Sequence, residues 1–414
     1  MWQTFPLALL LWFGGSALAG PARIVVGTDA PTPADALTMA NDGDTVVIPA
    51  GDWHGPLVVR TAIVLQGEPG AVVKGTGRGT VLRIEAPNVT VEGLVIRDGG
   101  NDLDGPDCGI YVAPTATKAI LRHNEIHAPA FGIWIHQTEG AEIVGNHIFG
   151  SRTGHPSNRG NGIHLFDATG LIIRKNWVVG GRDGIYVSAT EHSLIENNRT
   201  EKLRYGIHYM YSYDNRVTRN QSIDNVIGFA LMQSRNLVVE KNQAIGNQRD
   251  GLLFRDAQYC QIRHNLLREN GQGMFFYSST DNTIRENRLE ENQVGVKIWA
   301  GSLRNRVTGN VFRGNAKQVF YVGTADLAWG EEDAGNYWDD YLGWDMDGDG
   351  LGDRPYRINS FSSHLVHRYP AANLLLRSPA LELLTHLEQK LPLFQVPTLI
   401  DRAPLLEETD HGNH

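Results

Sequence analysis

Short apolar runs, each opened by a glycine and closed by polar turn residues, recur along most of the chain. Successive glycines of this kind lie 22 or 23 residues apart, with a single interval of 30. They are Gly109, Gly132, Gly162, Gly184, Gly206, Gly228, Gly251, Gly273 and Gly295. A parallel series of asparagines keeps the same spacing: Asn124, Asn146, Asn176, Asn198, Asn220, Asn242, Asn265, Asn287 and Asn310. Both series share the long interval, so the extra residues before Gly162 are predicted to form a surface loop.

Each repeat contains two or three short β-rich runs and no stretch long enough for a crossover helix. A unit of about 22 residues cannot enclose a core alone, but stacked copies can, as a parallel β-helix with coils about 4.8 Å apart. Asparagine tolerates left-handed turns and can bond its counterpart one coil along. The asparagine series is therefore predicted to be a structural ladder. The segment 57–84 carries earlier coils of the same kind.

Side chains of a strand alternate between faces, so the residues after each glycine divide into inward and outward columns. The first and third positions are mostly apolar and point inward, and they include Met274, which is assigned to the core. The second column reads Tyr111, Trp134, His164, Tyr186, His208, Ala230, Leu253, Phe275 and Lys297. The fourth reads Ala113, His136, Phe166, Ser188, Met210, Met232, Arg255, Tyr277 and Trp299. An outer face so rich in aromatic, histidine and methionine residues is typical of a binding surface.

Three outward residues suggest a metal. His208 and Met210 stand two positions apart on one face, and Met232 occupies the column of Met210 one coil later. Imidazole and thioether groups together suit a soft ion such as Cu(I). The alternative is that the three side chains pack under a loop or against a partner.

The outward columns argue against an enzyme. β-Helix lyases and hydrolases use paired carboxylates for acid–base chemistry, and neither outward column contains Asp or Glu. Asp167, Asp183 and Asp250 lie nearby, at strand ends, where we expect them to be solvated. We therefore predict a protein that is not an enzyme. Two alternatives stay open: a carbohydrate-active lyase, hydrolase or epimerase, and a docking scaffold without metal.

Composition narrows the choice further. The chain is 41% hydrophobic with a net charge of −9, so it can bury a core and lacks the basic field of a nucleic-acid binder. Its two cysteines, Cys108 and Cys260, would lie six coils apart, roughly 29 Å at the strand spacing. That is beyond disulfide reach, and two separate thiols are predicted.

Four segments are predicted. Residues 1–19 read as a signal peptide cleaved near Ala19, because an apolar stretch precedes a small-residue site. Residues 20–334 form the β-helix, 335–370 an acidic capping segment and 371–414 a helical and extended tail.

The capping segment contains four aspartates in a D-x-D-x-D-G pattern that suits a hard cation such as Ca²⁺. They are Asp345, Asp347, Asp349 and Asp353. A hydrated acidic turn is the alternative to a structural calcium loop. Trp338, Tyr341 and Trp344 are expected to cover the end of the core.

The tail is predicted to contain a helix that starts at Ser378-Pro379 and ends at Pro392. It would dock a membrane partner or pack on the β-helix. The leucines that would carry the docking are Leu374, Leu375, Leu381, Leu384, Leu387 and Leu391.

Three segments of the chain resemble the periplasmic NosD proteins of nitrous oxide reductase maturation. They are GIHYMYSYDNRV (206–217), GNYWDDY…DMDGDGLGDRPY (335–356) and HRYPAANLLLRSPALELLTHLEQKLP (367–392). The resemblance implies an all-β, right-handed parallel β-helix, exported to the periplasm and held at the inner membrane through its partner.

The resemblance also implies a function and partners. The protein would work with an ABC-type permease and its ATPase in supplying copper to nitrous oxide reductase, with a copper chaperone as a further partner. His208, Met210 and Met232 become the copper contacts, and the tail becomes the permease-docking arm. No phosphate-binding loop occurs in the sequence, so ATP hydrolysis would belong to the partner.

Overall fold

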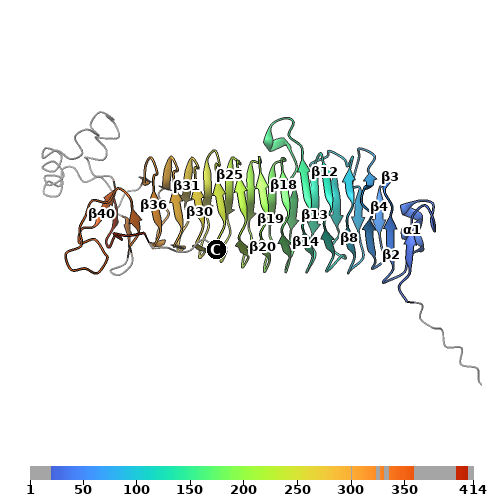
Figure 1. The fold of residues 1–414 in the computed structure, drawn as a ribbon, viewed down its shortest axis with the longest axis horizontal. Coiled ribbons are helices and arrows are strands. Elements are labelled where there is room, and N and C mark those ends of the chain that lie inside the picture. Colours follow the sequence, from blue (N-terminus) through green and yellow to red (C-terminus); the bar gives the residue numbers. More distant parts are fainter. Residues whose placement is uncertain (1–19, 300, 323–326, 331–334, 359–397, 409–414) are drawn as a thin grey trace, which may run out of the picture.

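Three long parallel sheets wind around one core in a computed structural model that describes residues 20–299, 301–322, 327–330, 335–358 and 398–408. Figure 1 shows the resulting tube, whose coils follow one another in sequence order. The prediction of an all-β, right-handed parallel β-helix with coils of about 22 residues is confirmed. The helical tail that was part of this prediction lies outside the described residues.

The strands of the described residues fall into four sheets. The first sheet contains β1 (Arg23–Val25), β2 (Thr45–Ile48), β5 (Val64–Gly67), β8 (Thr90–Glu92), β11 (Ile120–Arg122), β14 (Glu142–Val144), β17 (Ile172–Arg174), β20 (Leu194–Glu196), β23 (Arg216–Thr218), β26 (Val238–Glu240), β29 (Gln261–Arg263), β32 (Thr283–Arg285) and β35 (Arg306–Thr308). The second, called here the Gly-led sheet, contains β4 (Leu57–Val59), β7 (Leu82–Ile84), β10 (Cys108–Val112), β13 (Phe131–His136), β16 (Ile163–Phe166), β19 (Asp183–Ser188), β22 (Tyr205–Met210), β25 (Ile227–Met232), β28 (Asp250–Arg255), β31 (Gln272–Tyr277), β34 (Val294–Trp299) and β37 (Val319–Val322). The third contains β3 (Gly51–His54), β6 (Ala71–Lys74), β9 (Val95–Arg97), β12 (Glu125–Ala128), β15 (His147–Gly150), β18 (Trp177–Val179), β21 (Arg199–Glu201), β24 (Gln221–Ile223), β27 (Gln243–Ile245), β30 (Leu266–Arg268), β33 (Arg288–Glu290), β36 (Val311–Arg313) and β39 (Tyr337–Trp338). The small fourth sheet contains β38 (Leu327–Trp329), β41 (Leu399–Asp401) and β40 (Tyr356–Ile358).

The asparagine ladder is present as a continuous hydrogen-bonded column. Asn220 is typical: its Oδ1 accepts from the backbone N–H and from Nδ2 of Asn198, each at 2.9 Å, and its own Nδ2 donates to Asn242 Oδ1 at 3.0 Å. The left-handed conformation falls on the residue before the ladder position, for example Arg219 with φ of 55°. The left-handed turn expected at the ladder asparagine is therefore found one residue earlier. The asparagine itself contributes the hydrogen bonds of its side-chain amide.

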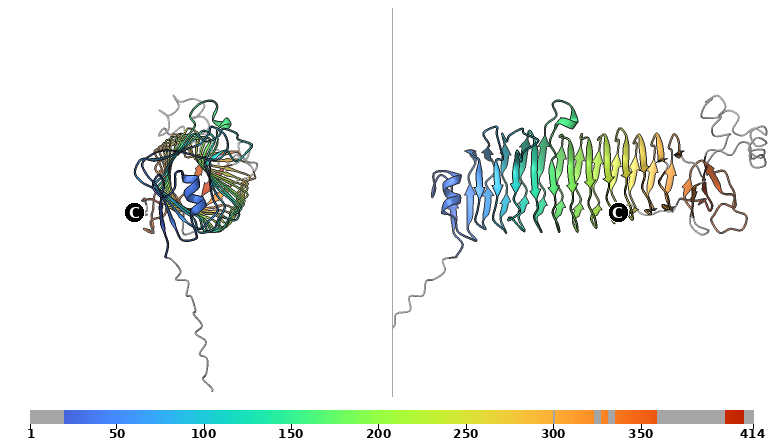
Figure 2. Two further views of the ribbon diagram at one scale, coloured as in Figure 1. Left: turned by 90° about the vertical axis from the view of Figure 1, so that its right-hand side faces the viewer. Right: turned by 180° about the vertical axis from the view of Figure 1, so that it is seen from behind.

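A short helix covers the first coil at the N-terminal end. Helix α1 (Pro33–Met39) begins with Thr32, whose hydroxyl accepts from the Asp35 N–H, and with proline at the first helical position. It buries Pro33, Ala36 and Leu37, and Figure 2 shows it lying across the open end of the tube. This helix was not predicted from the sequence.

The other end is closed by stacked rings. Trp338 is buried and stacks on Phe312 and on Tyr356, with ring centroids 4.1 and 4.5 Å apart, respectively. Trp338 covers the core as expected, but Trp344 is 48% exposed and does not; buried Trp329 joins the stack instead.

The ladder also runs further than the periodicity suggested. Asn336, beyond the proposed boundary at residue 334, accepts from Asn310, and its own amide donates to Asp401 at 2.8 Å. Asp401 Oδ2 also accepts from the Trp338 indole at 3.0 Å. Glu408 then pairs with Arg288 and Arg313 on the side of the tube. Residues 398–408 of the predicted tail thus close the ladder rather than extend from the protein.

Three smaller expectations have structural answers. The insertion forms an exposed loop containing the 3₁₀ turn η1 (Pro156–Asn158), which projects from the tube in Figure 1. Cys108 and Cys260 are separate, buried thiols, and burial raises the pKa of each to about 12. In the part of the chain that the structure describes, no helix has the length and apolar character needed to cross a membrane.

Candidate metal centre

The three residues of the proposed copper site lie on the outer face of the Gly-led sheet. His208 and Met210 are outward residues of β22, alternating with Ile207 and Tyr209, which are fully buried in the core. Met232 is on β25, directly in register with Met210, so that adjacent coils bring the two thioether side chains side by side. The regular stacking of coils therefore brings residues from two coils to one patch.

His208 is held by one ring nitrogen and leaves the other without a partner. Its Nδ1 lies 2.9 Å from Asp183 Oδ2, and its Nε2 is buried with no hydrogen-bond partner among the described residues. Because an ionised carboxylate only accepts, Nδ1 carries a proton and donates it to Asp183, and in the neutral ring the lone pair is then on Nε2. A histidine whose one nitrogen donates to a carboxylate while the other remains free has the arrangement of metal-binding histidines.

Asp183 is fixed in turn by Arg204 from the next coil. The guanidinium donates to both carboxylate oxygens, at 2.9 and 2.7 Å, and Asp183 is fully buried. Burial alone would raise the pKa of Asp183, but the hydrogen bonds from His208 and Arg204 outweigh it and hold that pKa below its ordinary value. Arg182 Nε also lies 3.8 Å from Asp183 Oδ2, so the ionised carboxylate faces two guanidinium groups.

Aromatic rings enclose the imidazole. Tyr186 and Tyr205 meet the His208 ring edge-on, with centroids 5.1 and 4.7 Å away, and the Arg204 guanidinium covers the Tyr205 ring at 4.3 Å. The imidazole, 6% exposed, is therefore shielded from water on both sides.

The methionines lie in an apolar cluster on the same surface. Met232 is 9% exposed and packs with Ile227, Ala230 and Leu253, and Met210 lies against this group. Neutral thioethers in an apolar setting, together with an imidazole on the same face of β22, are donor types that fit Cu(I). No charged ligand is among them, which is unlike the oxygen-rich sites of hard cations.

Another histidine of the same column is held differently. His164 Nδ1 receives the amide of Asn161 at 3.1 Å, and the ring stacks on Trp134 at 4.4 Å. Burial lowers the pKa of His164 to about 3, with the charge of Arg182 adding to the effect. With Nδ1 already an acceptor, this ring serves packing rather than the metal centre.

Sequence reasoning missed the carboxylate that orients the site. Asp183 and Asp250 were expected to be solvated at strand ends, and this is wrong: both begin strands of the Gly-led sheet and are fully buried. Only Asp167 is exposed, at a turn. The periodic pattern gave no signal for this burial, because at Asp183 it comes from contacts with Arg204 and His208 of the next coil.

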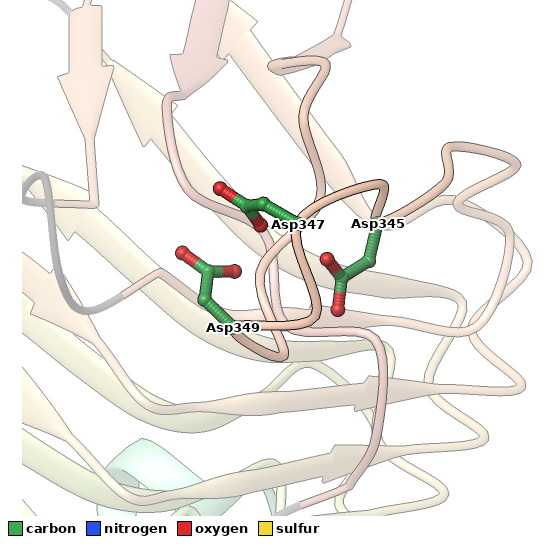
Figure 3. A group of neighbouring side chains, drawn as sticks. All are labelled: Asp345, Asp347 and Asp349. Carbon is green, nitrogen blue, oxygen red and sulfur yellow. The ribbon is translucent and has the colours of Figure 1, made fainter.

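The acidic loop brings three of its four aspartates together. One carboxylate oxygen from each of Asp345, Asp347 and Asp349 lies within 4.8 Å of the other two. Figure 3 shows the three side chains on one loop. The negative charge of Asp349 raises the pKa of Asp347, and backbone N–H groups of Gly350 and Gly348 lower that of Asp345. Asp353 stands apart, accepting the Met346 N–H at 2.8 Å. Calcium binding here stays a prediction.

The docking leucines, Leu374 to Leu391, lie outside the described residues, as does the signal segment 1–19. Their roles stay predictions.

Solved structures similar to this chain share its fold at low sequence identity. An exopolygalacturonase of family 28 from Yersinia enterocolitica matches with a TM-score of 0.57 at 11% identity, over 74% of this chain and 77% of that one. The A-module of the mannuronan C-5 epimerase AlgE6 from Azotobacter vinelandii matches with a TM-score of 0.54 at 17% identity, over 68% and 88%. These likenesses establish the β-helix and nothing of its chemistry.

Similarity in sequence is much closer to one family. The family model described as "Periplasmic copper-binding protein (NosD)" matches residues 149–343, which include His208, Met210 and Met232. A protein of Stutzerimonas stutzeri named "Probable ABC transporter binding protein NosD" is 35% identical over 97% of this chain and 93% of its own length. A protein of the same name from Pseudomonas aeruginosa is 37% identical over 94% of this chain and 95% of its own length. The chain belongs to the NosD family.

Proposed function

We propose that this protein carries Cu(I) in the periplasm and passes it on during maturation of the copper sites of nitrous oxide reductase, working with an ABC-type permease and its ATPase. Copper is its cargo, held by His208, Met210 and Met232. A copper chaperone is the expected donor. The printed descriptions of the family and of its named relatives, as copper-binding and as ABC transporter binding proteins, support this assignment.

One observation carries the copper part of the proposal. The buried Nε2 of His208 has no partner among the described residues, although a buried nitrogen lone pair without a partner costs roughly 1–3 kcal/mol. A copper ion would fill that need, because it accepts the lone pair that no donor of the described chain reaches. Met210, two residues along the same strand, and Met232, its register partner on the next coil, would supply the other ligands.

Competition for Cu(I) with a chromogenic chelator, under anaerobic conditions, tests the site. The wild-type chain should bind one Cu(I), and a His208→Ala/Met210→Leu/Met232→Leu variant should lose that binding. Leucine retains the apolar packing of both methionines. Met274→Leu is the matched control, because this methionine points into the core and is fully buried. Unchanged affinity and stoichiometry in the triple variant would remove the site assignment.

Docking to the membrane complex is proposed for the leucine-rich segment 374–391. Deleting all of 371–414 would not test it cleanly, since that change also removes Asp401 and Glu408 from the end of the tube. Serine substitutions at Leu381, Leu384 and Leu387 leave those contacts in place. They should abolish co-purification with the permease while Cu(I) affinity stays unchanged; full co-purification would contradict the docking role.

A binding function fits this surface better than catalysis. The buried carboxylate beside the metal centre, Asp183, is committed to Arg204 and His208 and has a lowered pKa, so it offers no proton to a substrate. A copper titration that fails, together with turnover of a uronic-acid polymer, would favour the carbohydrate-active alternative.

A further inference from the structure

An exposed aromatic patch lies on the outer face of the last coils of the Gly-led sheet. Its members, called here the C-terminal patch, are outward residues of β31, β34 and β37: Tyr277, Lys297, Trp299, Phe320 and Val322. Lys297 is in register with Phe320, and Trp299 with Val322. The three rings and the valine are from 36% to 46% exposed, and β37 is the last strand of this sheet among the described residues. Apolar side chains that gather in this way on adjacent coils mark an interaction surface.

The positive charges of this patch lie against aromatic rings rather than against carboxylates. The Lys297 ammonium is 4.9 Å from the centre of the Phe275 ring and 5.3 Å from that of the Trp299 ring. The Lys317 ammonium is 4.5 Å from the centre of the Phe320 ring, and burial lowers the pKa of Lys317. Among the described residues, neither lysine has a carboxylate within ion-pair distance. Both lysines are partly exposed, so their charges are available to a partner.

Several cations elsewhere on the tube are held by carboxylates, for example Arg263 by Glu240 at 2.8 Å. Lys297 acts on one carboxyl, that of Asp250: burial raises its pKa to about 6, against the charges of Arg249 and Lys297. Asp250 is fully buried and Arg249 already lies 3.4 Å from it, so it adds no negative charge to the surface. The C-terminal patch is therefore a basic aromatic area on a chain whose net charge is −9.

The arrangement of the rings indicates what kind of molecule fits. The Tyr277 and Trp299 planes are inclined by 53°, and Phe275 meets Trp299 edge-on. Sugars and bases stack on open ring faces, and these inclined rings do not form such a platform. A membrane of anionic lipid fits poorly as well, because the chain carries a net charge of −9 and the rings are more than half covered. A protein surface, whose side chains adapt to inclined rings, fits best.

We infer that the C-terminal patch is a docking surface for a partner protein whose contact area has an apolar centre and a rim of aspartate or glutamate. Apolar side chains of the partner would cover Tyr277, Trp299 and Phe320, and its carboxylates would pair with Lys297 and Lys317. Charge pairing of this kind directs association to the patch, although the chain as a whole repels an acidic protein.

The position of the patch relative to Met232 gives the docking a use. The outward column of Met232 continues through Arg255 and Tyr277, each in register with the residue before it, to Trp299, whose ring centroid lies 5.7 Å from that of Tyr277. Three coils separate Met232 from Trp299, roughly 14 Å at the strand spacing. An interface of ordinary size extends further than this, so a docked protein would also reach Met232. The docking itself does not depend on copper.

Photocrosslinking from Val322 tests the docking in cells that produce the full-length chain with its native partners. A benzoylphenylalanine at this exposed position should crosslink a protein, and the crosslinked peptide should combine apolar residues with aspartate or glutamate. Lys297→Glu/Lys317→Glu should abolish that crosslink. A benzoylphenylalanine at Met39, exposed on α1 at the other end of the tube, is the control and should not capture the same protein.

Binding of the captured protein, once purified, gives the magnitude. Lys297→Glu/Lys317→Glu should raise the dissociation constant by about tenfold or more, because two attractive charge pairs become repulsive. Lys175→Glu/Lys241→Glu makes the same change in net charge at exposed turns and should leave the dissociation constant unchanged. Glu286 occupies the equivalent turn of another coil, so glutamate is tolerated there. Changing the partner's mapped carboxylates to lysine should restore binding to the Lys297→Glu/Lys317→Glu chain.

Each outcome bears on the docking surface. Failure of Val322 to capture a protein, or capture of lipid, polysaccharide, a second copy of this chain or a segment of the same chain, would overturn it. So would binding that neither the lysine reversals nor Val322→Glu weakens, in variants that circular dichroism shows to keep the β-helix. Cu(I) affinity should be the same in these variants as in the wild type. A failed copper titration would therefore count against the proposed function and leave the docking surface standing.

Discussion

The asparagine ladder makes a quantitative prediction about what holds the coils together. Asn220→Leu keeps the branching and the number of side-chain heavy atoms but removes every amide contact. The Asn198 N–H then loses its acceptor, at 2.9 Å, and the Ile195 carbonyl loses its donor, also at 2.9 Å. Each buried polar group left unsatisfied costs about 1–3 kcal/mol, so the free energy of unfolding should fall by about 2–6 kcal/mol.

Urea unfolding followed by circular dichroism measures this loss. Asn101→Leu, at an exposed position, is the control and should change the free energy of unfolding very little. Asn242→Leu should match Asn220→Leu, because its side-chain amide makes the same contacts one coil along. A loss at Asn220 no larger than at Asn101 would show that apolar packing alone sets the coil register, and would refute the ladder as a source of stability.

Other predictions concern buried groups elsewhere in the tube. The pKa of Asp250 is raised in the folded chain, so ionisation of this carboxyl opposes folding. The free energy of unfolding should therefore decline as pH rises from about 4 through about 6. Urea unfolding at a series of pH values should show a smaller decline in Asp250→Asn. Asp401→Ala leaves two donors of Asn336 and the Trp338 indole without their acceptor, so amide hydrogen exchange should accelerate in the last coil and not in the first. Cys108 and Cys260 should resist a thiol reagent at pH 8 in the folded chain and react fully in urea, since both thiols are buried with pKa values of about 12; reaction of the folded chain would contradict their burial.

The repeat could be predicted from the sequence because its physical signal is redundant. Every coil has the same pattern of inward apolar residues and the same ladder asparagine. Only one register of stacked coils therefore aligns both features along the whole chain. That also placed Met210 and Met232 in one column, since register follows directly from a spacing of 22 residues. A residue's column in the repeat therefore gives its neighbours in adjacent coils.

The features that were not predicted from the sequence are those that do not recur from coil to coil. Asp183 looked like a solvated turn residue because its burial depends on Arg204 and on His208 of the next coil, and no periodic pattern signals that contact. The structures that close the two ends of the tube also occur only once in the described chain, so no repeat predicts them. Helix α1 had a capping signal in Thr32 and Pro33 that was open to recognition. Asp401, by contrast, meets the ladder from 65 residues away in sequence, a pairing that only the fold reveals.

X-ray absorption at the copper edge tests the proposed Cu(I) ligands most directly. The sample is the full-length chain loaded anaerobically with one equivalent of Cu(I). We expect monovalent copper with one nitrogen and two sulfur neighbours, and loss of the sulfur signal in Met210→Leu/Met232→Leu. A spectrum of oxygen and nitrogen neighbours only, or one that the double substitution leaves unchanged, would contradict it.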